Sequence, residues 1–595
     1  MEAAAITTSG RSTLLYRSCD NCRKRKTKCG SEDPCANCRT SNLVCQYTVR
    51  RRNRVRQAPR KIAQVINSPS LSAYVDVTTS LPESSPQHES LHVPTCQYQI
   101  HGSRAMSKVV GDDHGPWSPG QDDWDSPQSL SPTAFSSVSV AAAGNSFGTF
   151  EAVWSNLLLS IQAALPALPM LDIVNNCITL FMQYTFPTSP IIHEATVRAH
   201  ALAYFSETAS NGNFKPNNIH QSVKHMRAFT LITAVCASTA SVMPESLLPY
   251  GSIVAVPFFR SSRQMLHIYE EYDIEQPDSS SLSVRDLQYS AAQHITGRSR
   301  LAYHIMGQAS LIAESLHLHQ ESSLSKKVPI ESQLLRLTFW HLYLSDAASV
   351  CLKTRAGILN QSFPRGSIDI HHSGEPVIHL LDPSKPRYGR FFEERLLLGF
   401  HLMERLWSSA ARIVLQMKNY EGTQDGKKPL VERLAVVFYD FVGIMDDLPL
   451  WLKISNLVAL PEDTAVEVFQ KKSFWVQRCT LTMTFHCLRL VILQQCIESG
   501  FVGVVGLDDE PLRVVMRKAG WVKDFVETME DIPFVYHQIK GEPSVQRIRL
   551  VGTILLEMVQ NVESDAIKLR LESYFKRLLD ILSKLNSKAS EELIA

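Results

Sequence analysis

Hydrophobic residues recur at three- and four-residue steps through most of the chain beyond about residue 150. This spacing places them on one face of an α-helix, so it predicts amphipathic helices packed around a shared core. The first clear stripe consists of Ile173, Cys177, Leu180, Phe181 and Tyr184. Because proline cannot continue a helix, we expect this helix to end at Pro187 and Pro190.

The same periodicity predicts further helices downstream. They cover residues 223–242, 304–316, 331–350, 394–415, 434–445, 474–496, 545–562 and 566–585. Ser283 followed three residues later by Asp286 has the spacing of a capping box, which predicts a helix start just before Leu287. The last helix carries one apolar stripe that could pack against its neighbours or form a dimer or cofactor groove. Few stretches alternate with period two, so the sequence predicts an all-α region.

Two segments lack any sustained periodicity. Residues 1–16 are small and polar, and residues 67–150 are rich in Ser, Pro, Gly, Asp and Gln. Such segments bury too little apolar surface to offset their ordering entropy, so we predict a disordered arm and a disordered linker. Acidic residues and tryptophans between positions 112 and 125 leave two interpretations open, an ordinary polar linker or an acidic-aromatic activation segment.

Charge is distributed unevenly along the 595 residues, although the formal net charge is only +2 and the composition is ordinary for a globular protein. Residues 11–61 hold fifteen Lys or Arg against three Asp or Glu. This asymmetry indicates a polyanionic partner for one end of the chain. No uninterrupted run of eighteen apolar residues is present, so we expect no membrane partner.

Six cysteines lie close together within the basic segment, in the pattern C-x2-C-x6-C-x5-C-x2-C-x6-C. They are Cys19, Cys22, Cys29, Cys35, Cys38 and Cys45. A C-x2-C pair lets adjacent thiolates bind one metal from a tight turn, and zinc accepts four such sulfurs. Six sulfurs can complete two four-sulfur sites only if two of them bridge. A disulfide framework is disfavoured because the first residues lack the apolar core of a signal peptide.

Between the first C-x2-C pair and Cys29, five of six residues are basic, which a zinc staple used only for protein contacts would not need. The segment resembles the DNA-binding domain of the fungal binuclear zinc-cluster (Zn2Cys6) transcription factors, including Pro34 in the loop before the fourth cysteine. The resemblance implies two Zn2+ ions bridged by Cys19 and Cys35. Cys22 and Cys29 would complete one site, and Cys38 and Cys45 the other.

The resemblance also implies double-stranded DNA as a partner and assigns roles to the basic residues. Arg25 and Lys26, at the end of the first short helix, would reach base edges of a CGG-like triplet in the major groove, where guanine offers paired acceptors. The predicted phosphate contacts are Arg17, Arg23 and Lys28. A second basic run predicts a nuclear localisation signal, and hence the nucleus, through Arg50, Arg51, Arg52, Arg54 and Arg56.

Parts of the helical region resemble the regulatory middle domain of the same fungal family. The matching fragments are 186–193, 309–319 and 336–346. In the second fragment His317 stands where the family has Gly, which disfavours a tight helix stop. The predicted organisation is an arm at 1–16, the zinc-cluster domain at 17–47, a basic linker at 48–66, a disordered linker at 67–150, an all-α regulatory domain at 151–562 and a C-terminal amphipathic helix at 563–595.

Family members often dimerise through a leucine heptad, but this chain offers only Ile62, Val65 and Ile66 before Pro69. A monomer and a homodimer formed by the helical region therefore both stay open. The remaining cysteines are scattered among apolar residues and are predicted to be buried free thiols. They are Cys96, Cys177, Cys236, Cys351, Cys479, Cys487 and Cys496.

No HExxH, P-loop or GxSxG motif occurs, and adjacent His371 and His372 beside Glu375 form at best a weak metal pair, so we predict that the protein is not an enzyme. The sequence favours a transcription factor that reads DNA, activates a metabolic or biosynthetic gene set and contacts the transcription machinery. Two alternatives remain, a repressor that senses a small-molecule inducer and a zinc-scaffolded co-regulator that does not read DNA itself.

Overall fold

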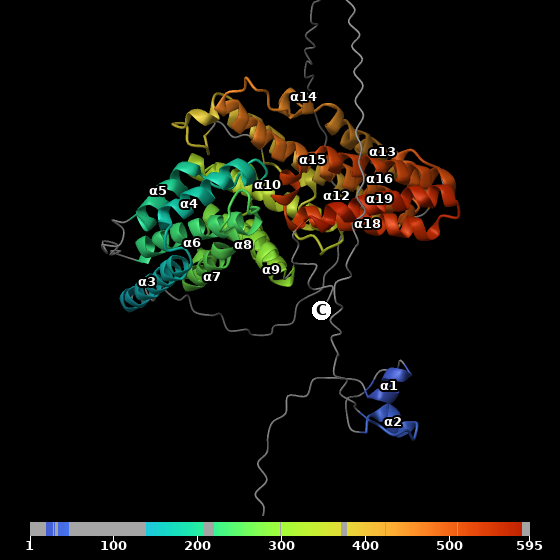
Figure 1. Cartoon of the computed structure of the whole chain (residues 1–595), viewed down its shortest axis with the longest axis horizontal. Helices are drawn as coiled ribbons and strands as arrows, with labels where there is room; N and C mark the ends of the chain where they lie inside the picture. Colours follow the sequence, from blue (N-terminus) through green and yellow to red (C-terminus); the bar gives the residue numbers. More distant parts are fainter. Residues whose placement is uncertain are drawn as a thin grey trace, which may run out of the picture. The chain divides into compact units, whose positions relative to one another are not determined.

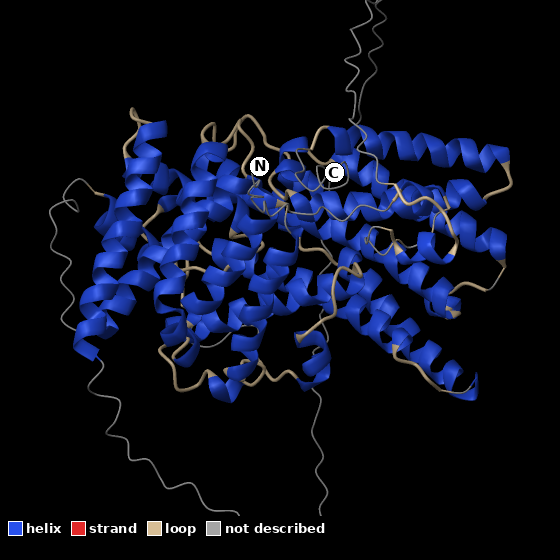
Figure 2. Ribbon diagram, turned by 90° about the horizontal axis from the view of Figure 1, so that it is seen from below, coloured by secondary structure: helices blue, strands red, loops and turns tan. Residues whose placement is uncertain are grey.

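The computed structural model describes residues 19–25, 27, 29, 34–46, 139–206, 219–297, 299–370, 378–422, 424–508 and 510–585. The chain divides into two compact units, residues 1–123 and 124–595 (Figure 1). Within the described residues both units consist of helices and loops (Figure 2), apart from one isolated bridge between Gln320 and Asp369. The predicted fold class, a small cluster domain followed by a large all-α region, is confirmed.

The first unit contains two short helices, α1 (Asp20–Lys24) and α2 (Ala36–Thr40). Its described buried residues are four of the six cysteines. A unit with so little apolar surface cannot be held by hydrophobic burial, so its stability has to come from another source.

The second unit contains the remaining helices. They are α3 (Ser139–Ala164), α4 (Met170–Leu180), α5 (Glu194–Phe205), α6 (Ile219–Val242), α7 (Gly251–Glu275), α8 (Ser279–Thr296), α9 (Ser299–Ser315), α10 (Pro329–Cys351), α11 (Leu359–Ser362), α12 (Phe392–Lys418), α13 (Gln424–Asp446), α14 (Ile454–Leu457), α15 (Ala465–Ser499), α16 (Pro511–Asp531), α17 (Phe534–Gln538), α18 (Glu542–Asn561) and α19 (Asp565–Ser583).

Helices α3 to α9 form one end of this unit and α13, α16, α18 and α19 the other, with α10, α12 and α15 between them (Figure 1). Helix α10 packs on α8 and α12, and α12 packs on the long helix α15. Trp340 on α10 and Trp407 on α12 are among the largest fully buried side chains. One continuous hydrophobic core therefore links the two ends.

The stripe that predicts the first helix is buried as expected. Helix α4 is followed by one π-helical turn over Phe181–Thr185, and the chain leaves the helix before Pro187. The wider turn keeps Phe181 and Tyr184 on the core side. The helices expected at 223–242, 304–316, 331–350, 394–415, 434–445, 474–496, 545–562 and 566–585 correspond to α6, α9, α10, α12, α13, α15, α18 and α19.

The predicted capping box at Ser283 and Asp286 is wrong. Helix α8 begins at Ser279, and its capping box is formed by Asp278 and Ser281. The Asp278 carboxylate accepts hydrogen bonds from the backbone N–H groups of Ser280 and Ser281, so the helix starts one turn earlier. The hydroxyl of Ser283 instead donates to the carbonyl of Ile191, 2.8 Å away, and joins α8 to a distant loop.

The expectation that His317 would weaken the stop of α9 is also wrong. His317 adopts the left-handed conformation that favours glycine, with a φ of 50°. The N–H of Leu318 then donates to the carbonyl of Ala313 at 3.2 Å, which is the long hydrogen bond of a Schellman helix end. Leu318 is buried, so the packing of this residue holds the turn without glycine.

Several helices were not predicted from the sequence. Helix α3 begins inside the expected linker, and α5, α7 and α16 lie between the predicted ranges. Helix α16 nevertheless buries one apolar face, which includes Trp521, Phe525 and Met529. The apolar stripe of α19 packs on α16 and α18 of the same chain. No described helix is long and apolar enough to cross a membrane. The arm at 1–16 and residues 47–138 lie outside the described residues, as do His371, His372 and Glu375.

Six of the scattered cysteines are confirmed as buried free thiols, whereas Cys96 lies outside the described residues. Burial raises the pKa of Cys479, Cys487 and Cys496 to about 12, because the apolar surroundings disfavour the thiolate. These thiols are therefore neutral core residues and are poor nucleophiles.

Candidate metal centre and nucleic-acid interface

Each C-x2-C pair lies at the start of a short helix. Cys19 immediately precedes α1 and Cys22 lies within it, whereas Cys35 is the N-cap residue of α2 and Cys38 lies within that helix. Helix geometry brings residues three apart to the same face, so each helix holds two sulfurs side by side. These four cysteines are at most 2% exposed.

The two halves of the motif make the same hydrogen bonds, sixteen residues apart in the sequence. The N–H of Cys22 donates to the sulfur of Cys19 at 3.4 Å, and the N–H of Cys38 donates to the sulfur of Cys35 at 3.4 Å. An N–H pointing at sulfur favours the thiolate over the thiol, which is the form that binds metal. The first and fourth cysteines therefore occupy equivalent positions.

The third and sixth cysteines also occupy equivalent positions. The N–H of Cys19 donates to the sulfur of Cys29 at 3.3 Å, and the N–H of Cys35 donates to the sulfur of Cys45 at 3.3 Å. The two halves of the motif therefore have the same local structure. In each half the last cysteine contacts the cysteine at the start of the helix in that half.

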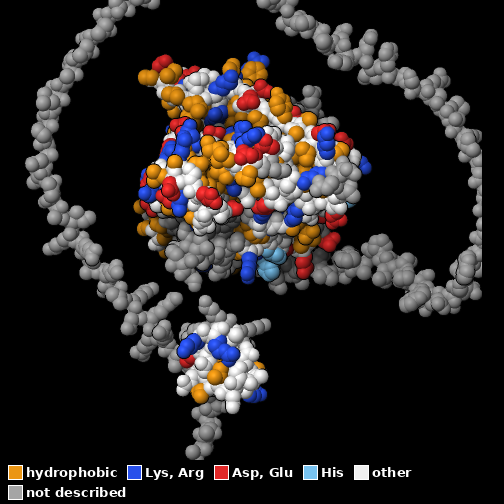
Figure 3. Space-filling view, turned by 90° about the vertical axis from the view of Figure 1, so that its right-hand side faces the viewer, with side chains coloured by type: hydrophobic (Ala, Val, Ile, Leu, Met, Phe, Trp, Pro, Cys, Tyr) orange, Lys and Arg blue, Asp and Glu red, His pale blue; other side chains and the backbone are white. Residues whose placement is uncertain are grey.

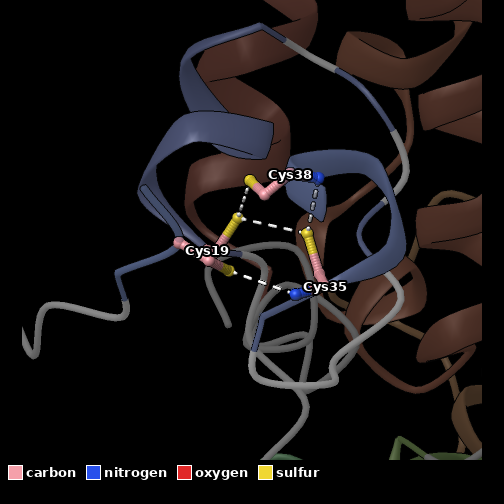
Figure 4. Close-up of side chains that lie close together, drawn as sticks. Cys19, Cys35 and Cys38 are labelled. Atoms are coloured by element: carbon pink, nitrogen blue, oxygen red, sulfur yellow. Dashed lines mark hydrogen bonds between the residues drawn. The ribbon is translucent and has the colours of Figure 1, made fainter. Parts of the chain in front are cut away.

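The sulfur atoms converge without forming disulfides. The distance from the sulfur of Cys19 is 3.7 Å to that of Cys35 and 3.6 Å to that of Cys38 (Figure 4). The sulfurs of Cys22 and Cys35 are 3.5 Å apart. A tetrahedral zinc site with Zn–S bonds of about 2.3 Å places its sulfurs about 3.8 Å apart. The described spacing therefore suits metal thiolate ligation and is far too long for an S–S bond.

The six sulfurs fall into two groups of four. One group is Cys19, Cys22, Cys29 and Cys35, and the other is Cys19, Cys35, Cys38 and Cys45; within each group the ligand atoms lie within 4.8 Å of one another. Cys19 and Cys35 belong to both groups. Six cysteines can thus supply two four-sulfur sites, as the chemistry of zinc requires.

The two thiols of the second C-x2-C pair titrate differently. The backbone N–H of Cys38 lowers the pKa of Cys35 to about 6, so its thiolate is readily available. Burial raises the pKa of Cys38 above its ordinary value, and the hydrogen bonds of its thiol with the sulfurs of Cys19, Cys35 and Cys45 raise it further. Metal binding releases the protons of such thiols, so the metal and the folded cluster are coupled through pH.

Further hydrogen bonds fix the helix ends and the last loop of the cluster. Helices α1 and α2 end with the same long hydrogen bond, from Thr27 N–H to the carbonyl of Cys22 at 3.0 Å and from Leu43 N–H to the carbonyl of Cys38 at 2.9 Å. The Asn21 side chain donates to the carbonyl of Val44 at 2.6 Å. Sequence reasoning missed Asn21, whose only signal is its position between two ligands.

The basic residues that the structure describes lie on the surface of this unit. Lys24 and Arg25, at the end of α1, are exposed, and Arg39 on α2 is exposed and donates to the carbonyl of Pro34. The face drawn in Figure 3 carries Lys and Arg side chains on this unit. Nothing is described for the side chain of Arg23. The other predicted DNA and localisation contacts lie outside the described residues, namely Arg17, Lys26, Lys28, Arg50, Arg51, Arg52, Arg54 and Arg56.

Residues 17–54 match the fungal Zn(2)-Cys(6) binuclear cluster domain. The chain is also 32% identical over 80 residues to the "Probable transcriptional regulatory protein STB4" of Saccharomyces cerevisiae, a match that covers 13% of this chain and 8% of that protein. It is 47% identical over 52 residues to "multidrug resistance regulator 2" of Candida albicans, covering 9% of this chain and 7% of that protein. The matches thus span less than a tenth of either relative.

The described geometry and the family match agree on the nature of the N-terminal unit. The chain carries a fungal Zn(2)-Cys(6) binuclear cluster domain, and this domain binds two zinc ions. The resemblance of residues 151–562 to the fungal regulatory domain stays a prediction.

Proposed function

We propose that the protein is a nuclear, sequence-specific DNA-binding regulator of transcription. The observation that carries this proposal is the two-zinc cluster with exposed basic residues at the end of its first helix. Two fungal relatives are named as regulators, which supports the same conclusion. In this role the zinc ions fold the cluster, and no residue needs to act as a catalyst.

The internal repeat favours the first half of the cluster as the part that reads bases. Lys24, Arg25 and Lys26 correspond to Thr40, Ser41 and Asn42 of the second half, sixteen residues later. The first half therefore has three consecutive cations at its helix end, whereas the second half has Arg39 in the last turn of α2 and no cation at these three positions. Arg25 and Lys26 are the proposed base contacts to a CGG-like triplet, because guanine presents N7 and O6 as paired acceptors in the major groove.

The surrounding cations complete the proposed interface. Arg17, Arg23 and Lys28 would bind phosphates, which position the domain without reading sequence. The basic run at residues 50–56 would add phosphate contacts and direct the protein to the nucleus. Cys19 and Cys35 are the proposed bridging ligands, because each belongs to both four-sulfur groups.

The helical region is proposed to regulate the DNA-binding unit, by dimerisation, by contact with the transcription machinery or by binding an inducer. Activation of a metabolic or biosynthetic gene set is the primary hypothesis. A reporter driven by the selected DNA site would rise with an activator and fall with a repressor.

The test is selection of random duplex DNA by the full-length zinc-loaded chain at near-physiological salt. We expect a CGG-like triplet to be enriched, once for a monomer and twice for a dimer. Arg25→Ala should lose the triplet. Arg39→Ala, the exposed cation of the second half, is the matched control and should retain the triplet with weaker overall binding. If the wild-type chain enriches no sequence, the cluster is a scaffold and the proposal fails.

A further inference from the structure

A cavity lies between the two ends of the helical unit. It has a volume of about 210 Å³ and is lined by residues of α8, α10, α12, α18 and the loop that follows the π-helical turn. One ordered water needs only about 10–15 Å³ in this measure, so the cavity has room for a small organic molecule. We call it the central cavity and define it by Thr188, Asp286, His341, Trp407, Lys540 and Arg547.

Two of the residues that line the central cavity, Lys540 and Arg547, are cations. The ammonium of Lys540 donates to the hydroxyl of Thr188 at 2.7 Å, and the guanidinium of Arg547 lies over the ring of Trp407, 5.6 Å from its centroid. Arg547 is only 8% exposed, and its buried Nε has no hydrogen-bond partner among the described residues. Neither cation forms an ion pair with a carboxylate in the described part of the chain.

Another buried arginine of the helical unit, Arg285, is arranged differently. Arg285 is fully buried and donates to the carboxylate of Asp273 at 2.6 Å. Buried charges in proteins are normally paired in this way, because an unpaired charge loses its hydration without compensation. Burial lowers the pKa of Lys540 to about 7 for the same reason. Lys540 and Arg547 are therefore unusual, because neither has a carboxylate partner among the residues that the structure describes. A bound anion would compensate their charge.

Another lining residue has the opposite charge. Asp286 is only 4% exposed, and one of its oxygens lies 3.3 Å from Nε2 of His341. Its other oxygen, Oδ1, is buried and has no partner in the described residues, and the same holds for Nδ1 of His341. This pair can accept a hydrogen bond from a hydroxyl or amino group of a ligand. Apolar side chains, among them Leu344 and Met403, line the cavity as well.

We propose that the central cavity binds a small organic carboxylate whose anionic group pairs with Lys540 and Arg547 and whose hydroxyl or amino group donates to Asp286. The aliphatic body of such a ligand would contact the apolar lining. This inference rests on the proposed regulatory role of the helical region and names the chemical class of its inducer.

The test is the thermal unfolding of the full-length zinc-loaded protein with a chain-length series of straight ω-hydroxycarboxylates. Each is compared with the matching ω-hydroxyamide, which lacks the charge, and with the plain carboxylate, which lacks the hydroxyl. We expect at least one hydroxycarboxylate to raise the unfolding temperature with the logarithm of its concentration, whereas its amide does not.

Variants test the two cations and Asp286 separately. Lys540→Met should weaken binding of the carboxylate by about tenfold or more, since a charged hydrogen bond is lost. If Lys540→Met does not fold, Arg547→Gln takes its place, and it should weaken binding of the carboxylate in the same way. Asp286→Asn should remove only the advantage of the hydroxyl group. Lys568→Met removes an exposed cation of α19 and serves as the matched control, with unchanged binding expected.

Two outcomes overturn the inference. In the first, no carboxylate raises the unfolding temperature more than its amide does. In the second, Lys540→Met and Arg547→Gln respond like the wild type, which would reveal a general salt effect. The proposed function is judged separately by the selection of DNA. A chain that binds the carboxylate but enriches no sequence refutes DNA reading alone, and a chain that reads DNA without binding the carboxylate refutes this inference alone.

Discussion

The zinc cluster and the helical region are folded by different forces. The described buried residues of the cluster are Cys19, Cys22, Cys35 and Cys38, whereas the helical unit buries an extended core with tryptophans and phenylalanines at its centre. Metal ligation supplies folding free energy directly in small domains that cannot bury enough apolar surface. The comparison teaches that one chain contains a unit whose folding depends on zinc and a unit whose folding does not.

Removal of zinc should produce the largest difference between the two units. A strong chelator should unfold the cluster and abolish DNA binding, because the ligand sulfurs lose the ions that hold them together. The thermal transition of the helical unit should stay unchanged. Circular dichroism and DNA binding on the same sample check this, and a parallel loss of the helical transition would show that the two units fold together.

The next effect is the loss of a shared ligand. Cys35→Ala removes a sulfur that lies in both four-sulfur groups, so we expect the protein to lose both zinc ions. Cys45→Ala is the matched control, because Cys45 belongs to one group only and the other site keeps its four ligands. Zinc content by mass spectrometry measures both variants. Retention of two ions by Cys35→Ala would refute its bridging role.

A core truncation should act on the helical unit alone. Trp340 is fully buried, and the guanidinium of Arg365 lies 4.5 Å from its ring centroid. Trp340→Ala should lower the free energy of unfolding of this unit by about 3–5 kcal/mol, because it removes a large buried ring. Tyr439→Ala, at a side chain that is 79% exposed, should change it by about 0.5 kcal/mol or less. Denaturant unfolding measures both, with zinc content unchanged.

A smaller effect is expected at the DNA interface. Lys26→Ala should weaken binding to the selected site by about 1–3 kcal/mol while changing non-specific binding far less, because the proposed base contact would be lost. Titration of specific and scrambled duplexes at one salt concentration distinguishes the roles. An equal loss on both duplexes would identify Lys26 as a phosphate contact.

The smallest effect concerns a single turn. His317→Gly should stabilise the helical unit by about 1 kcal/mol or less, because glycine adopts the left-handed conformation without a steric penalty. Its greater freedom in the unfolded chain offsets part of this gain. A small rise in the unfolding temperature checks the prediction, and a clear fall would show that the imidazole of His317 contributes through its contact with His319.

Local patterns account for what could be predicted. The spacing of six cysteines predicted a zinc site, because ligand geometry depends on residues close together in the sequence, and the resemblance to the zinc-cluster family implied two ions. The amphipathic periodicity determined most helices for a similar reason. The start of α8 was misplaced because Asp278 and Ser281 compete with Ser283 for the same role, and the strength of a cap depends on backbone geometry.

The sequence by itself determined a two-zinc, six-cysteine domain beside a large helical region, since both signals are local. Only the tertiary structure decided that Lys540 and Arg547 share a cavity with Asp286 and His341. Asp286 and Lys540 lie more than two hundred positions apart, so no spacing in the sequence connects the four residues. Packing of distant helices brings their charges together, and unpaired charge becomes visible only when burial is known.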